Sequence, residues 1–184
     1  MKGFLDAAEL VLSDRIEGGY VNNQKDSGGE TNHGITQPIL DQAKRLALVP
    51  TDTTIKSLME QQAQRIYQKL FWETLRCGEV PYCVGLLVFD TAINHGQTWA
   101  AKSLQSTLRV RVDGIIGPET VSAVHALNYA GRIKLLINLC RVRLKHYLRE
   151  VPPVTEEEFE LGWAYRVVDV LAAAVEAAVE ERIA

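Results

Sequence analysis

The chain has 184 residues, 47% of them hydrophobic and 23% charged, which is the composition of an ordinary globular protein. This length suits one compact domain, or one domain with a small appended subdomain. The net charge of −3 argues against nucleic acid as a partner, because phosphate binding needs clustered excess Lys and Arg. No uncharged apolar run reaches the length needed to cross a bilayer, so we expect no membrane span.

The first predicted helix runs from Phe4 to Ile16 and is broken at Gly18-Gly19. Glu17 therefore lies on the last turn, where the partial negative charge of the helix end disfavours ionisation of a carboxyl group. The Gly-rich polar segment that follows indicates tight turns or a β-hairpin, since glycine takes a positive φ without steric cost. This segment carries a second acid, Asp26, and the hydroxyl of Thr31. Such a layout suits a two-group hydrolytic site.

The rest of the chain has helical periodicity, with one turn-rich insert near its middle. A helix starts after Thr36 with Pro38 in its first turn, and the pair Gly117-Pro118 starts another. Pro152-Pro153 ends a helix, and Thr155-x-x-Glu158 is a capping box for the last one. In chain order, the predicted helices cover about 37–46, 55–72, 82–95, 99–108, 118–127, 131–148 and 156–178.

No pattern points to a metal or a cofactor. The four histidines are scattered without metal-ligand spacing. Cys77, Cys83 and Cys140 are an odd number of cysteines, and we expect buried free thiols or a disulfide between Cys77 and Cys83. The basic run from Arg141 to His146 is interpreted as a solvated helix face or as a set of partners for nearby acids.

The Gly-rich segment also carries a resemblance. Glu17-Gly-Gly-Tyr20, followed by Asp26-x-Gly-Gly-x-Thr31-x-x-Gly-Ile-Thr36, resembles the opening motif of glycoside hydrolase family 108, the bacterial and phage N-acetylmuramidases that cleave peptidoglycan. The resemblance implies that Glu17 is the catalytic acid. A similarity to the Glu/Asp/Thr arrangement of phage-type lysozymes implies roles for Asp26 and Thr31, with an Asp-to-Thr spacing one residue shorter here.

A second resemblance lies in the insert. Asp113-Gly-Ile-Ile-Gly117-Pro-x-Thr120, preceded by Gln105, resembles a turn of peptidoglycan-binding modules, which follow the catalytic part in this family. We therefore predict a catalytic region over 1–95 and a peptidoglycan-binding-like helical region over 96–184, packed on it as one body. The implied fold is mainly α and lysozyme-like, with one small β-hairpin after the first helix.

Three residues are predicted to bind substrate, each with a structural alternative. Tyr20 and Trp72 would cover apolar faces of sugar rings, or else pack in the core. Asn94 would read N-acetyl groups with its amide, or else act as a helix C-cap beside Gly96. The segment Gly162-Trp163-x-x-Arg166 also resembles the family.

The catalytic candidates have alternatives as well. Asp26 would orient water or stabilise positive charge at the sugar, or else shape the hairpin as an Asx-turn. Thr31 would position water or hydrogen-bond within the ribbon. Trp163 is expected to pack in the core, and Arg166 to pair with an acid or with a wall carboxylate.

The sequence thus predicts a lysozyme that cleaves the β-1,4 bond between N-acetylmuramic acid and N-acetylglucosamine in peptidoglycan strands, as a monomer or weak homodimer. The alternatives are a non-catalytic wall-binding or secretion-associated protein that keeps the fold, and a peptidoglycan amidase or peptidase. Asp6 and Glu9 interrupt the N-terminal apolar run, so no signal peptide is evident. We expect synthesis in the cytoplasm and action on the cell wall or in the periplasm after release or export, as for a phage or prophage endolysin.

Overall fold

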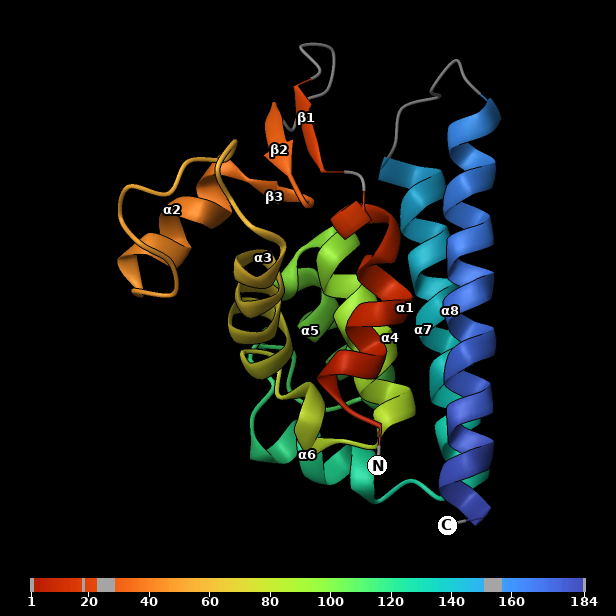
Figure 1. Cartoon of the computed structure of the whole chain (residues 1–184). Coiled ribbons are helices and arrows are strands. Elements are labelled where there is room, and N and C mark those ends of the chain that lie inside the picture. Colours follow the sequence, from red (N-terminus) through yellow and green to blue (C-terminus); the bar gives the residue numbers. More distant parts are fainter. Residues whose placement is uncertain (1, 18, 23–28, 151–156, 184) are drawn as a thin grey trace. The chain divides into compact units, whose positions relative to one another are not determined.

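The computed structural model describes residues 2–17, 19–22, 29–150 and 157–183, and helices are its main elements (Figure 1). The chain divides into two compact units, Met1–Thr74 and Leu75–Ala184. Within the described ranges, no helix combines the length and the apolar character that crossing a membrane requires. The mainly α fold that the sequence predicts is confirmed.

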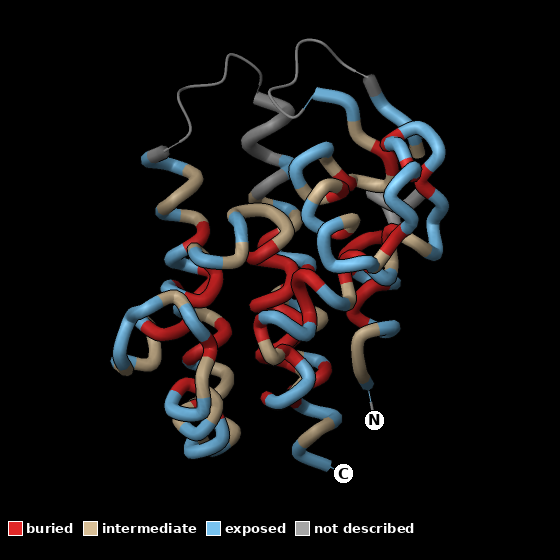
Figure 2. Tube along the Cα trace, turned by 90° about the vertical axis from the view of Figure 1, so that its left-hand side faces the viewer, coloured by how far each residue is buried: buried red, intermediate tan, exposed pale blue. Residues whose placement is uncertain are grey.

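The first unit combines α-helices and a π-helix with a small sheet. Its core contains buried apolar residues of α1, α2 and α3. Figure 2 colours the buried residues of the chain red along the Cα trace. In chain order the elements are α1 (Phe4–Glu17), β1 (Tyr20–Asn22), β2 (Glu30–Asn32), β3 (Ile35–Thr36), α2 (Gln37–Arg45), α3 (Glu60–Ile66) and the π-helix η1 (Tyr67–Glu73).

The sheet follows α1 directly and is antiparallel, with the strand order β1-β2-β3 (Figure 1). Tyr20 lies opposite Asn32, and Asn32 lies opposite Ile35 on its other side. The turn between β2 and β3 consists of His33 and Gly34, with φ values of 51° and 73°. Two consecutive positive φ angles are the type I′ geometry that fits the twist of a hairpin. The predicted hairpin after the first helix is therefore present, and a second hairpin, β2–β3, extends it.

The helix predicted over 55–72 begins later than its apolar spacing indicates. Ile55 and Leu58 are buried, but they belong to a turn in which the Leu58 N–H donates to the Ile55 carbonyl at 3.3 Å. The helix begins at Glu60. The residue before it, Met59, donates a hydrogen bond from its backbone N–H to the side chain of Gln62 at 2.9 Å. Apolar residues three positions apart are compatible with a single turn as well as with a helix. The spacing of Ile55 and Leu58 therefore predicts a helix start five residues before the observed one.

The second unit is built around α4, which packs against η2, α5, α7 and α8. Residues Cys83 to Ala92 of α4 are all buried, as expected for a helix that is apolar on nearly every side, and Asp90 and Thr91 are the polar residues among them. The alanines of α8 at 174, 177 and 178 are buried, so this Ala-rich helix packs within the chain. The elements are η2 (Cys77–Glu79), α4 (Tyr82–His95), α5 (Gln97–Leu108), α6 (Pro118–His125), α7 (Tyr129–Glu150) and α8 (Glu157–Ile183).

These helices lie close to their predicted positions. Gly96, with φ of 85°, ends α4, and Pro118 lies in the first turn of α6 as predicted. Thr155 of the predicted capping box lies outside the described residues. Residues 141–146 are not simply a solvated face, because Arg143 within them is buried.

All three cysteines are buried free thiols, so the alternative of a disulfide between Cys77 and Cys83 is wrong. Burial raises the pKa of the Cys83 thiol to about 12 and that of Cys140 to about 11, and it also raises the pKa of Cys77. Thiols with such pKa values stay protonated at neutral pH, so they are unreactive packing groups.

Candidate active site

The candidate site begins where α1 ends. Glu17 is the last residue of α1, and its side chain lies outside the described part of the structure. Gly19 has a φ of 58°, a left-handed conformation that turns the chain from the helix into β1. The carbonyl of Gly19 accepts a hydrogen bond from the backbone N–H of His33 at 3.1 Å. The residue that follows the central strand β2 is therefore hydrogen-bonded to Gly19, which lies two residues after Glu17.

Two predicted site residues lie on this sheet. Tyr20 is the first residue of β1, and its side chain is exposed. Thr31 is the middle residue of β2, half-buried, and lies between Val21 and Thr36 of the flanking strands. Glu17, Tyr20 and Thr31 thus come from the corner between α1 and the sheet, whereas Asp26 lies outside the described residues.

The sheet is held to the rest of the first unit by Asn32, a residue that sequence reasoning did not single out. Its side chain is buried, and its amide nitrogen donates to the carbonyl of Ile55 at 2.9 Å and to that of Leu58 at 3.2 Å. The hydroxyl of Tyr67 donates to the carbonyl of His33 at 3.2 Å and holds the adjacent turn. Asn is a common turn residue, so its type carried no signal of this inward-facing role.

Trp72 is buried and packs edge-to-face on Phe4, with ring centroids 6.0 Å apart and an interplanar angle of 66°. Phe4 is the first residue of α1 and Glu17 is the last. At 1.5 Å per residue these two ends are about 20 Å apart. This position supports the core role that the sequence left open for Trp72, rather than a contact with sugar beside Glu17.

Asn94 lies in the second unit, in the last turn of α4. Its side-chain nitrogen donates to the backbone carbonyl of Asp90 at 2.7 Å and to the Asp90 carboxylate at 3.2 Å. The residue that ends the helix is Gly96. The amide hydrogens of Asn94 are therefore engaged within α4.

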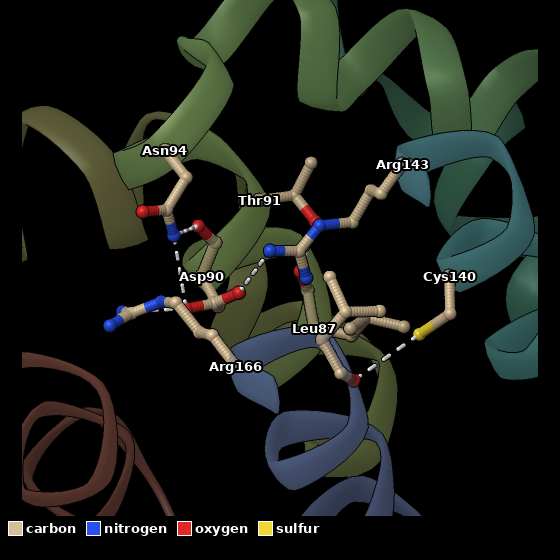
Figure 3. Close-up of polar contacts among 8 residues, drawn as sticks. Leu87, Asp90, Thr91, Asn94, Cys140, Arg143 and Arg166 are labelled. Carbon is tan, nitrogen blue, oxygen red and sulfur yellow. Dashed lines mark hydrogen bonds and ion pairs between the residues drawn. The ribbon is translucent and has the colours of Figure 1, made fainter. Parts of the chain in front are cut away.

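Asp90 is the centre of an ion cluster that joins three helices (Figure 3). Its fully buried carboxylate lies 2.6 Å from Arg143 of α7 and 2.7 Å from Arg166 of α8. The Arg166 Nε also donates to Asp90 at 2.8 Å. This contact confirms the acid-pairing role predicted for Arg166.

The loop between α5 and α6 is organised by Gln105, which is buried. The Gln105 side-chain nitrogen donates to the Asp113 carboxylate at 2.8 Å, and its oxygen accepts from the backbone N–H of Gly114 at 2.8 Å. Gly114 has a φ of 82°, and Thr120 lies 3.4 Å from the same Gln105 nitrogen. The residues that resemble a peptidoglycan-binding turn therefore form one hydrogen-bonded loop.

Aromatic rings gather on the same unit around His95. Ring centroids of Trp99, His146 and Tyr147 lie 4.6, 5.1 and 4.5 Å from that of His95. Burial first, and then the positive charge of Arg143, lowers the pKa of His95 to about 4. Among the residues that the structure describes, no group of three His, Cys, Asp or Glu side chains could hold a metal ion.

Comparison with known families and structures gives consistent results. The model of the family described as glycosyl hydrolase 108 matches residues 11–96, and that of the family described as "Predicted Peptidoglycan domain" matches residues 95–168. The solved structure of SagA from Brucella abortus is similar, with 32% sequence identity, a TM-score of 0.78 and 95% of each chain covered. No curated protein matches the chain.

The fold and these matches define a glycoside hydrolase with a lysozyme-like helical fold that acts on the bacterial cell wall. The chain belongs to the glycosyl hydrolase 108 family and carries a C-terminal peptidoglycan-binding region.

Proposed function

We propose that the protein is an N-acetylmuramidase that cleaves the β-1,4 bond between N-acetylmuramic acid and N-acetylglucosamine, with Glu17 as the general acid. The observation that carries the proposal is the position of Glu17 as the final residue of α1, directly before the antiparallel sheet. This corner also lies inside the region matched by the glycosyl hydrolase 108 model.

A glycosidic bond has a poor leaving group, which needs a proton from a carboxyl that is still protonated near neutral pH. The last turn of a helix presents unpaired carbonyls with partial negative charge, which disfavours an ionised carboxylate. In the proposed mechanism, this property of a helix end would favour the protonated form of Glu17. The sheet that follows would supply the opposite wall of a sugar site.

The remaining roles follow from positions on the sheet. Asp26 belongs to the segment that joins β1 and β2, and we assign it as the second carboxylate, which orients water or stabilises positive charge on the sugar. Thr31 would hold the water from the central strand. Tyr20 has an exposed ring close in sequence to Glu17 and would cover the apolar face of a sugar.

The second unit would hold the wall while the first unit cleaves it. The hydrogen-bonded loop around Gln105 lies in the region matched by the peptidoglycan-domain model, which supports this assignment. The substrate would therefore be assembled peptidoglycan rather than short free sugars.

The test is mass analysis of purified peptidoglycan after digestion by the wild type and by Glu17→Gln. We expect muropeptides with new reducing N-acetylmuramic acid ends from the wild type and intact wall from the variant. Glu30→Gln is the matched control, because Glu30 is an exposed carboxylate at the start of β2, and it should digest wall like the wild type.

Each other result contradicts part of the proposal. Full activity of Glu17→Gln would remove Glu17 from the mechanism. New amino groups without new reducing ends would identify an amidase or peptidase. Wall binding without any cleavage by the wild type would identify a non-catalytic wall-binding protein.

A further inference from the structure

The outer face of α7 is basic, and none of the described residues of the second unit covers it. Lys134, Arg141 and Lys145 are exposed, and helical geometry places them on the side of α7 opposite the buried Leu136 and Arg143. Val142 is also exposed and lies at the edge of this face, between Arg141 and Arg143. Val142 is 37% exposed. This face therefore combines positive charge with an exposed aliphatic side chain.

The outer face of α8 has the opposite charge. Asp169 and Glu176 are exposed on it together with Tyr165 and Val168, which are 63% and 58% exposed. Within the described residues, none of Lys134, Arg141, Asp169 and Glu176 forms an ion pair. Exposed aliphatic and aromatic groups rimmed by unpaired charges are features of a protein interaction surface.

The two faces lie on neighbouring helices that run side by side (Figure 1). Contacts between α7 and α8 set their relative heights, because the Cys140 thiol contacts the Val167 carbonyl and Arg132 pairs with Glu181. Because α7 and α8 are antiparallel, residue numbers increase along α7 in the direction in which they decrease along α8. Within about one helical turn, this register puts Arg141 level with Asp169, Val142 with Val168, and Lys134 with Glu176.

We propose that this α7–α8 face binds a second copy of the chain through a two-fold axis parallel to the helices. This axis keeps every residue at its own height and places α7 of one copy against α8 of the other. Arg141 then meets Asp169 of the second copy, Lys134 meets Glu176, and Val142 meets Val168. Each contact occurs twice, and the four helices form an antiparallel bundle.

Charge excludes the other face-to-face arrangement. A two-fold axis perpendicular to the helices would place α7 against α7 and α8 against α8. The basic face of α7, which carries Lys134, Arg141 and Lys145, would then meet the same basic face of the second copy, and like charges in contact oppose association. Self-complementarity of charge therefore selects the second copy as the occupant and also its orientation.

The matched segment, residues 134 to 145 of α7, is only about 17 Å long, so the interface is small. Small interfaces are weak and transient, and we expect a micromolar dimer that dissociates on dilution and at high salt. The inference is independent of the catalytic assignment, because it involves only α7 and α8.

The first test is a charge swap in the full chain, followed by sedimentation equilibrium over a range of concentrations up to about 100 µM. Arg141→Glu and Asp169→Arg should each weaken the dimer at least about tenfold, since each variant creates two like-charge contacts. The double variant should dimerise like the wild type, because the pairs are restored with reversed sign. A wild type that stays monomeric, or a double variant weaker than both single variants, would overturn the proposal.

The second test reads the orientation. Val142→Cys and Val168→Cys should each form few disulfides alone but should cross-link to each other when the two proteins are mixed and oxidised. The three native cysteines are buried and provide no competing surface thiol. Cross-linking of Val142→Cys to itself, in preference to the mixture, would contradict the parallel two-fold axis. Unchanged circular dichroism and melting would show that each variant is folded.

Discussion

The Oδ2 atom of Asp90 lies 2.6 Å from Nη2 of Arg143, and both side chains are almost completely buried. Arg166, from a third helix, shares the same carboxylate. One acid therefore compensates two guanidinium groups, and positive charge is in excess among these three side chains. Because charges removed from water need close partners, the carboxylate of Asp90 controls whether α4, α7 and α8 can pack together.

We predict that Asp90→Asn destabilises the protein by about 3–5 kcal/mol, since it leaves the buried guanidinium of Arg143 without a counter-charge. Urea denaturation monitored by circular dichroism measures the change. Lys69→Met is the control, because Lys69 pairs with Glu73 at 2.8 Å on the surface and its loss should cost less than about 1 kcal/mol. Equal losses of stability in the two variants would show that the buried ion cluster contributes no more to stability than a surface ion pair.

A second prediction concerns the hydrogen bonds by which Asn32 attaches the sheet to the rest of the first unit. Asn32→Ala removes the donor to the carbonyls of Ile55 and Leu58, and it should cost about 2–4 kcal/mol, because two acceptors that Asn32 pairs in the interior lose their donor. Thermal unfolding measures this loss. Asn32→Asp should be at least as harmful near neutral pH, because a carboxylate places negative charge against both carbonyl oxygens.

Gln42→Ala is the matched control for Asn32, since Gln42 is exposed on α2 and its loss should change stability by less than about 0.5 kcal/mol. Wild-type stability of Asn32→Ala would contradict the structural role. Wall-clearing activity should fall with the stability of the sheet, because the sheet forms one side of the proposed site.

The sequence predicted the elements well where a local signal marks their ends. Gly19 after α1 and Gly96 after α4 have positive φ angles, and Pro118 lies in the first turn of α6. The start of α3 was missed, because Ile55 and Leu58 have helical spacing but form a turn. Glycine and proline therefore predict where helices begin and end, whereas apolar spacing alone does not distinguish a turn from a helix.

Long-range partners could not be predicted in the same way. Arg143 lies in a basic run that is typical of a solvated face. Its partner Asp90 is 53 residues away along the chain, so no local pattern indicates the ion pair. Asn32 and Ile55 are likewise neighbours only after folding. Motif resemblance marked the corner around Glu17, but only packing showed that Trp72 contacts the far end of α1.

A third prediction concerns the dependence of stability on pH. The pKa of His95 is lowered to about 4 from 6.5 by burial, then by Arg143 and His146, and is partly raised by Asp90. The unfolded chain then binds the proton more tightly, so the stabilising contribution is complete above about pH 6.5 and is lost as the pH falls towards 4. A full shift would be worth about 3 kcal/mol, and partial exposure of the ring reduces this to about 1–2 kcal/mol.

His95→Gln should therefore flatten the fall in stability between about pH 6.5 and pH 4, measured by urea denaturation at several pH values. His125→Gln serves as the control, because His125 is exposed and bonds only the Glu79 carbonyl among the described residues. An unchanged pH slope in His95→Gln would show that the buried ring does not control acid stability.

The last prediction tests how closely α4 packs on η2. A Cβ atom at Gly85 would lie 2.4 Å from the backbone oxygen of Cys77, so Gly85→Ala forces the two segments apart. Alanine favours a helix by up to about 1 kcal/mol over glycine, but overpacking against backbone costs about 1–3 kcal/mol, and we expect net destabilisation. Gly162→Ala in α8 has open space around its Cβ and should instead stabilise the protein. Denaturant melts of both variants decide the matter, because a Gly85→Ala protein as stable as Gly162→Ala would mean that η2 is not held against α4.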